Sequence, residues 1–274
     1  MTMPAELVAS VTQPVFDWSF FTNAVIHPSG QFMTGLWRTI YISVVAQALG
    51  VVFGFVIALM RRSRFAGFRA AGAGYVWLVR GTPLLVQLVV VYNGLAATGL
   101  YRFEDSRVGP WIIMGVIKAA ILTLAANEAA YMSEIFRAAL DSIDVGQSEA
   151  AKALGMTPAL SMRVVLLPQA FRITIPPLGN EFNLMMKSTS LLSVIGVQEM
   201  FLTAQSINSA TFKTFEIFLA AAVYYLLLTG AWTIIQRWIE HRFNKGIRPA
   251  TSSDSLRSRF MGSVRDNRLV GGAR

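Results

Sequence analysis

The chain has 274 residues, of which 54% are hydrophobic and only 14% charged, and its formal net charge at pH 7 is +9. Soluble domains carry roughly 25% charged residues, so a soluble protein of this composition would expose large apolar patches. We therefore expect a membrane protein. The chain has no cysteine, which excludes disulfide bonds and thiolate metal sites.

The N-terminal segment, residues 1–33, is expected to lie outside the membrane-spanning part. Aromatic residues gather between positions 16 and 37 and favour a place along the membrane interface. A loosely attached leader is the alternative. We do not expect a cleaved signal peptide, because no basic region precedes an apolar run.

Residues 34–243 are predicted to form a transmembrane domain with five spanning helices. A span needs about 20 mostly apolar residues, and three uncharged stretches satisfy this, at 39–60, 81–101 and 217–236. Two further stretches carry two charges each. They are 111–133, with Lys118 and Glu128, and 173–197, with Glu181 and Lys187. The predicted fold class is an all-α integral membrane protein.

The distribution of Lys and Arg predicts the orientation of these spans. The first 37 residues contain neither, whereas 61–80 contains five Arg and 133–172 contains four Lys or Arg. We therefore expect the N-terminus outside and the C-terminus in the cytoplasm. Residues 244–274, with seven Lys or Arg and two Asp, are expected to be a disordered basic tail beside an anionic leaflet rather than a nucleic-acid arm.

The inner loop at 141–168 is predicted to form a compact helix–turn–helix. Ser148 can cap a first helix of small residues, Gly155 can end it in a left-handed turn, and Pro158 can begin a second short helix. An ordinary loop packed against its own bundle is the alternative.

This loop resembles the EAA motif, EAA–x3–G–x9–I–x–L–P, of permease subunits of bacterial ATP-binding-cassette importers. Seven positions carry the resemblance, with valine in place of isoleucine: Glu149, Ala150, Ala151, Gly155, Val165, Leu167 and Pro168. The resemblance implies a type I importer fold, in which this loop couples the permease to an ATPase subunit. The docking residues it implies are Glu149, Ala150, Ala151 and Gly155.

Three other segments resemble permeases for polar amino acids of the histidine, glutamine and arginine group. They are RGTPLLVQ at 80–87, AYMSEIFR at 130–137, and GNEF at 179–182 followed by KSTSLL at 187–192. The resemblance implies a multi-pass protein of the bacterial inner membrane that imports a polar amino acid by alternating access. Its implied partners are two ATPase subunits, a second permease subunit (a copy or a paralogue), and a periplasmic or lipid-anchored binding protein. No cofactor is expected on this chain. The chain lacks GxxxxGK[ST], so ATP and Mg²⁺ are expected at the partner ATPase.

Polar residues inside the predicted spans are candidates for the substrate pathway, because charges at membrane depth are costly and usually face a cavity or a partner. The candidates are Glu128, Glu181, Asn183, Lys187 and Ser188. Structural alternatives remain for both acids, namely a Glu128–Arg172 pair and a Glu181 bond across a dimer interface. Pro176 and Pro177 predict a kink or a short unwound turn beside Glu181.

Other functions are less consistent with the sequence. A membrane enzyme lacks support, because there is no HExxH or GxSxG motif and both histidines lie outside the predicted spans. A channel could use Glu128 and Glu181 as a charged ring, but it would need no coupling loop. An importer for an opine or another small polar solute is the nearer alternative. The two acids favour a basic or amide side chain in the substrate.

Overall fold

The computed structural model describes residues 16–109 and 111–243, and the expected disordered tail at 244–274 lies outside them, as do residues 1–15. The long helices are α3 (Gly30–Arg61), α7 (Gly115–Asp141), α10 (Leu167–Ser188) and α12 (Thr214–Phe243). The shorter helices are α2 (Trp18–Ile26), α4 (Ala66–Arg80), α5 (Leu84–Val89), α6 (Leu95–Ala97), α8 (Val145–Ala153), α9 (Pro158–Ser161) and α11 (Met200–Thr211). Two strands, β1 (Ser106–Val108) and β2 (Trp111–Ile113), form a small antiparallel hairpin.

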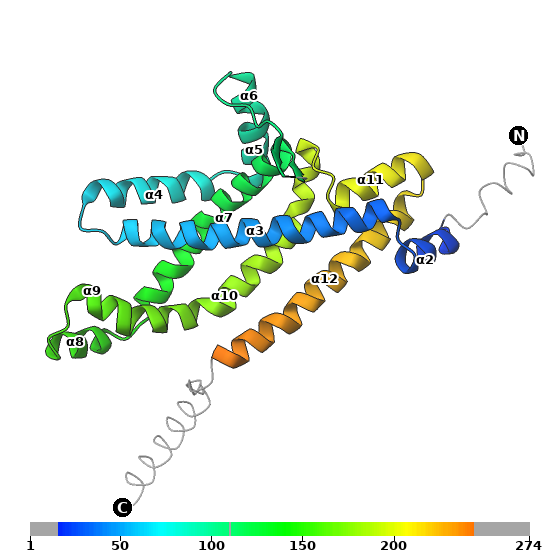
Figure 1. Cartoon of the computed structure of the whole chain (residues 1–274). Helices are drawn as coiled ribbons and strands as arrows, with labels where there is room; N and C mark the ends of the chain where they lie inside the picture. The colour runs from blue at the N-terminus through cyan, green and yellow to red at the C-terminus, as the bar shows by residue number, and fades with distance from the viewer. Residues whose placement is uncertain (1–15, 110, 244–274) are drawn as a thin grey trace, which may run out of the picture.

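The long helices form an elongated bundle whose two ends carry different elements (Figure 1). Helices α8 and α9 lie at one end, which we call the hairpin end, and α2 and α11 lie at the other, which we call the α11 end. Helix α4 runs back along α3 from the hairpin end, and α10 lies beside α12. The bundle is almost entirely helical, in agreement with the predicted fold class.

Small residues let α3 and α7 approach closely. The buried face of α3 contains Ala46, Gly50, Gly54 and Ala58 at steps of four residues, which places them on one side of the helix. A Cβ added at Gly54 would lie 2.5 Å from the Cβ of Met132 and 2.9 Å from a backbone oxygen of α7. Stripes of small residues are a common basis of helix packing in membranes.

The second predicted span differs from the expectation. Residues 61–80 were expected to be an inner loop, but 66–80 form α4, a 15-residue helix. The predicted span 81–101 does not stand alone either. Its helical part, residues 84–97, meets α4 at an angle of 103°. Pro83 explains the break, because proline lacks the N–H that a continuing helix needs. Arg69 and Arg80 therefore lie on a helix, whereas Arg62 and Arg64 lie in the turn between α3 and α4.

Gln87 stabilises this bend by taking up the backbone groups that the break leaves free. Its amide nitrogen donates to the carbonyl oxygens of Val79 (2.7 Å) and Thr82 (3.1 Å). Its amide oxygen accepts from Asn127 of α7 at 3.0 Å. The RGTPLLVQ segment therefore encodes a bent helix fixed to α7.

The expected unwound turn at Pro176 and Pro177 is absent, because α10 is helical through both prolines. Side chains of α12 bond to this part of α10: Trp232 donates to the carbonyl of Gly179 at 2.8 Å, and Gln236 reaches the carbonyl of Pro176 at 3.4 Å. Irregular helix occurs instead at both ends of α10. A π-helical turn, Met162–Leu166, precedes it and a 3₁₀ segment, Thr189–Ile195, follows it.

Helix α2 is attached to the bundle at the α11 end. Asp17 caps α2, forms an ion pair with Lys213 at 3.0 Å, and donates its backbone N–H to the buried carboxylate of Glu216 at 2.7 Å. The Tyr224 hydroxyl donates to the carbonyl of Val25. The described part of the N-terminal segment is thus an ordered helix rather than a loose leader.

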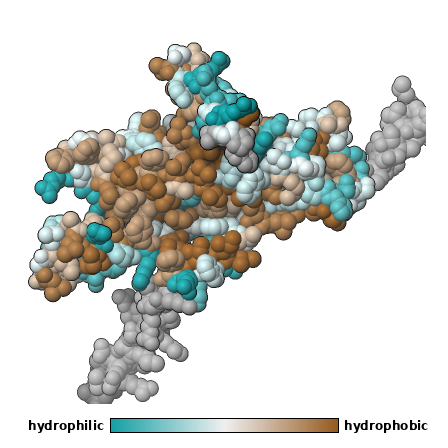
Figure 2. Space-filling model, in the orientation of Figure 1, coloured by the Kyte–Doolittle hydropathy of each residue, from teal (hydrophilic) through white to brown (hydrophobic). Residues whose placement is uncertain are grey.

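Within residues 16–109 and 111–243, α3 and α12 are long and apolar enough to cross a membrane, and the bent α4–α6 segment makes a third if it counts as one span. Helices α7 and α10 fall outside this set, although at about 1.5 Å per residue both are long enough, so the number five stays a prediction. Hydrophobic side chains cover the middle of the visible face, with hydrophilic ones toward its margins (Figure 2).

Candidate functional site

The loop at 141–168 folds as the predicted helix–turn–helix. Gly155 has φ of +72°, the left-handed region that favours glycine. Pro158 stands at the start of α9, and Thr157 caps that helix. The cap of α8 was predicted wrongly: the helix begins at Val145 and is capped by Asp144. Ser148 is therefore inside the first helix, because Asp144 provides an earlier cap.

The hairpin leaves three of its four expected docking residues accessible. Glu149, Ala150 and Gly155 are exposed, whereas Ala151 is only 3% exposed and packs inside the hairpin. Ala151 is therefore unavailable to a partner in this arrangement. The apolar side chains of Val145 and Leu154 are more than 70% exposed. A hairpin with uncovered leucine and valine has the character of a docking surface.

The base of the hairpin is joined to α7 and α10 by apolar packing. Ala139, Leu140 and Ala170 form a small buried cluster, with Ile143 and Met162 of the loop against it. Gln169 of α10 also donates to Gln147 of α8 at 3.3 Å. Movement of the hairpin would therefore be passed directly to α7 and α10.

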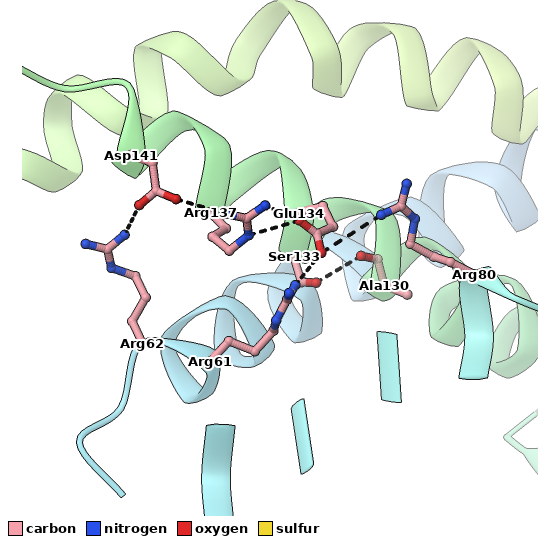
Figure 3. Close-up of polar contacts among 8 residues, drawn as sticks. All are labelled: Arg61, Arg62, Arg80, Ala130, Ser133, Glu134, Arg137 and Asp141. Atoms are coloured by element: carbon pink, nitrogen blue, oxygen red, sulfur yellow. Dashed lines mark hydrogen bonds and ion pairs between the residues drawn. The ribbon is translucent and has the colours of Figure 1, made fainter. Parts of the chain in front are cut away.

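An ion cluster around Glu134 lies beside this base and joins α3, α4 and α7 (Figure 3). Glu134 accepts from Arg61 at 2.6 Å and from Arg137 at 2.8 Å, and the Arg80 guanidinium lies 3.9 Å away. Asp141 pairs with Arg62 and Arg137. Glu134 and Arg137 of AYMSEIFR pair at i, i+3 spacing, and the segment acts as a junction of three helices.

Glu128, the first pathway candidate, is buried where α3 and α7 approach most closely. Its carboxylate accepts from the Gln47 side chain at 2.9 Å, and a Cβ at Gly50 would lie 2.5 Å from its Cγ. The alternative partner considered from the sequence, Arg172, is replaced by Gln47.

The remaining candidates divide between two places on α10. Glu181 is half-buried on α10. Lys187 lines a cavity of about 470 Å³, together with Ser190, Phe201, Phe218, Ala221, Ala222 and Tyr225. Asn183 and Ser188 are half-buried and are not among the residues of this cavity wall. The structure thus places Lys187 on a cavity that neither acid lines.

Glu199 was not among the candidates drawn from the sequence. Its side chain is fully buried and accepts four hydrogen bonds. The donors are the backbone N–H groups of Phe201 (2.9 Å) and Leu202 (2.8 Å), the Tyr225 hydroxyl (3.2 Å) and the Thr39 hydroxyl (3.3 Å). An acid immediately before the apolar start of α11 is a helix-cap pattern and was the available signal.

Comparison with known proteins is consistent with this geometry. A family model described as the binding-protein-dependent transport system inner membrane component matches residues 50–245. The glutamine transport system permease protein GlnP of Escherichia coli is 37% identical over 229 residues, which is 83% of this chain and 97% of that protein. The nopaline transport system permease protein NocM of Agrobacterium fabrum is 37% identical over 212 residues, 75% of this chain and 84% of that protein.

A solved structure agrees with these sequence relatives. The crystal structure of an amino acid ABC transporter with histidines has a TM-score of 0.69 and 33% identity, and the match covers 88% of this chain and 100% of that one. The family match spans more than half of the chain, and it includes the hairpin and the Glu134 cluster. The chain therefore belongs to the family of binding-protein-dependent transport system inner membrane components, the permease subunits of ATP-binding-cassette importers.

Proposed function

We propose that this permease subunit imports a polar amino acid and that two ATPase subunits drive it by docking on the α8–α9 hairpin. The observation that carries the proposal is the contrast within the hairpin. Its base is packed against α7 and α10, while Val145 and Leu154 are left uncovered. A partner that covers this face would move two long helices when it moves.

The hairpin end is proposed to face the cytoplasm. Arginines concentrate there, including Arg61, Arg62 and Arg137 of the ion cluster. Short cytoplasmic loops of membrane proteins carry an excess of such residues. In this orientation the α11 end faces outward, where a periplasmic or lipid-anchored binding protein would deliver the substrate. A second permease subunit would complete the pathway, since a bundle of this size encloses little space on its own.

Docking can be tested by cross-linking, because the chain has no cysteine of its own. Leu154→Cys should cross-link to a co-expressed ATP-binding-cassette ATPase subunit through a short bifunctional reagent. Leu226→Cys is the matched control, since Leu226 is also over 70% exposed but lies on α12. The docking proposal is wrong if Leu154→Cys gives no product, or if both variants give the same product.

The substrate pathway is proposed to include Glu128, Glu181 and Lys187, with Asn183 and Ser188 nearby on α10. The Lys187 ammonium group could bind the carboxylate of an amino acid, and the two acids could bind its cationic groups at another point of the pathway. The cavity at Lys187 has room for a small polar solute. The glutamine permease among the relatives supports an amide side chain. The nopaline permease supports an opine as the second candidate.

Vesicle uptake with the assembled importer would test this assignment. We expect Glu181→Gln and Glu128→Gln to lower uptake or change the preference between glutamine, arginine and nopaline. Glu104→Gln, a change at an exposed acid outside the spans, is the matched control. Unchanged uptake and preference in both test variants would exclude a role for these acids in the pathway.

A further inference from the structure

Glu199 and the groups that bind its carboxylate hold the start of α11 between two other helices. We call this set the Glu199 clamp, made of Thr39 of α3, Tyr225 of α12 and the first backbone N–H groups of α11. The Thr39 hydroxyl also accepts from the backbone N–H of Met200 at 3.3 Å. One buried carboxylate therefore fixes three helices at a single point.

A second row of contacts fixes the same segment to α3. Arg38 donates to the carbonyl of Gln198 at 3.0 Å. A Cβ added at Gly35 would lie 2.7 Å from the Thr203 hydroxyl and 3.0 Å from the carbonyl oxygen of Glu199. These close approaches make α3 a fixed support, so the Tyr225–Glu199 bond must separate when α12 moves away from α11.

The clamp borders the cavity that contains Lys187. Tyr225 is both a donor to Glu199 and a wall of that cavity, and Phe201, whose N–H binds the same carboxylate, is a second wall. The two aromatic side chains come from the two helices that the clamp joins. Their positions, and hence the shape of the cavity wall on this side, depend on the carboxylate.

We infer that Glu199 is a positioning residue that keeps the Lys187 cavity closed toward the α11 end, and that opening in this direction requires release of the Tyr225 hydroxyl. The inference rests on the proposed transport pathway, because closure matters only if solute passes through this cavity. Alternating access needs such a closure. A buried carboxylate suits it, because a partly separated clamp would leave polar groups without partners.

Thiol labelling in the assembled complex would test the inference. Ser190→Cys is a nearly isosteric change in the cavity wall, and its thiol is the only one in the chain. We expect slow labelling by a membrane-impermeant reagent from the α11 side in the nucleotide-free complex. Adding Tyr225→Phe should raise the rate about threefold, as expected for loss of one ordinary hydrogen bond. Glu199→Gln should raise it further, and trapping the parent with ATP and vanadate should give a similar increase.

Glu216→Gln is the matched control, because Glu216 is also a buried carboxylate at the α11 end but binds α2 instead of the clamp. Equal labelling of the parent, Tyr225→Phe and Glu199→Gln would overturn the inference, as would an equal increase in Glu216→Gln. If Glu199→Gln fails to fold, Tyr225→Phe decides, since it keeps the carboxylate and both backbone bonds. Labelling from each side of the membrane separately shows the orientation of the chain. An inverted orientation would refute the proposed function, but the comparison between variants would still test the Glu199 clamp.

Discussion

One glutamate joins three helices at each end of the molecule, but the two glutamates use different donors. Glu134, at the hairpin end, is bound by guanidinium groups of α3, α4 and α7, and its side chain is 22% exposed. Glu199, at the α11 end, is fully buried and is bound by two hydroxyls and two backbone N–H groups.

This difference predicts how each junction responds to movement. Partly exposed charged groups can exchange partners or return to water at small cost. A buried carboxylate bound by neutral donors cannot, because separation leaves both sides unsatisfied. The hairpin end is therefore suited to graded adjustment to a partner, and the α11 end to a closure with two distinct states.

The largest expected effect is loss of coupling in Gly155→Asp. The left-handed φ of +72° strains an L-residue, and the new charge lies on the exposed hairpin face that we propose for docking. We expect at least a roughly tenfold loss of uptake, by disruption of a docking surface, while the protein still inserts. Gly30→Asp at the opposite end, where a Cβ would meet nothing within 4 Å, should transport normally. Normal substrate-stimulated ATPase activity in Gly155→Asp would count against this role of the hairpin.

Replacing each glutamate by alanine tests the comparison directly. Glu199→Ala should lower the free energy of unfolding by about 2–4 kcal/mol, because it removes a helix cap and leaves buried donors unpaired. Glu134→Ala should lower the free energy of unfolding by only about 1 kcal/mol, because ion pairs between partly exposed side chains contribute little. Unfolding in mixed micelles at low and high salt would measure both. Only the Glu134 effect should shrink with salt, and the comparison fails if the two variants respond alike.

The helix pair that connects the two ends is tested by Gly54→Ala. The added Cβ would meet backbone and Cβ atoms of α7 within 3 Å, so we expect a loss of about 1–3 kcal/mol from overpacking. Gly74→Ala on α4 is the control, because nothing lies within 4 Å there and alanine favours helix. If Gly54→Ala is as stable as this control, α3 and α7 do not form a rigid connection.

How much of each region could be predicted from the sequence depends on whether its structure is set by nearby or by distant residues. Local signals identified the hairpin well, because Gly155 and Pro158 act through their own backbone. Apolar runs identified α3 and α12 for the same reason. The bend at Gln87 and the Glu199 clamp depend on partners 40 and up to 160 residues away, which no local pattern specifies. Arginine counting failed at 61–80 because it assigns a segment to a side of the membrane without distinguishing loop from helix.

The smallest expected effect concerns Asp17, which extends the comparison to a partly exposed carboxylate at the α11 end. Bonds from the Phe20 N–H, the Ser19 hydroxyl and Lys213 hold the pKa of Asp17 well below its usual range. The stabilisation of the folded protein by the ionised Asp17 carboxylate is therefore complete above the unfolded-state pKa of about 3.9. This stabilisation is lost as the pH falls through the lower folded-state pKa.

Asp17→Asn should leave the attachment of α2 nearly unchanged at pH 7, since asparagine also caps helices. The substitution should also remove the loss of α2 stability at low pH that protonation of Asp17 causes. Hydrogen exchange of residues 18–26 between pH 2.5 and 7 would measure this, with the Glu199 clamp peptides as the internal reference. A large loss of protection at pH 7 would mean that the Asp17–Lys213 pair carries more of the α2 attachment than an exposed ion pair should.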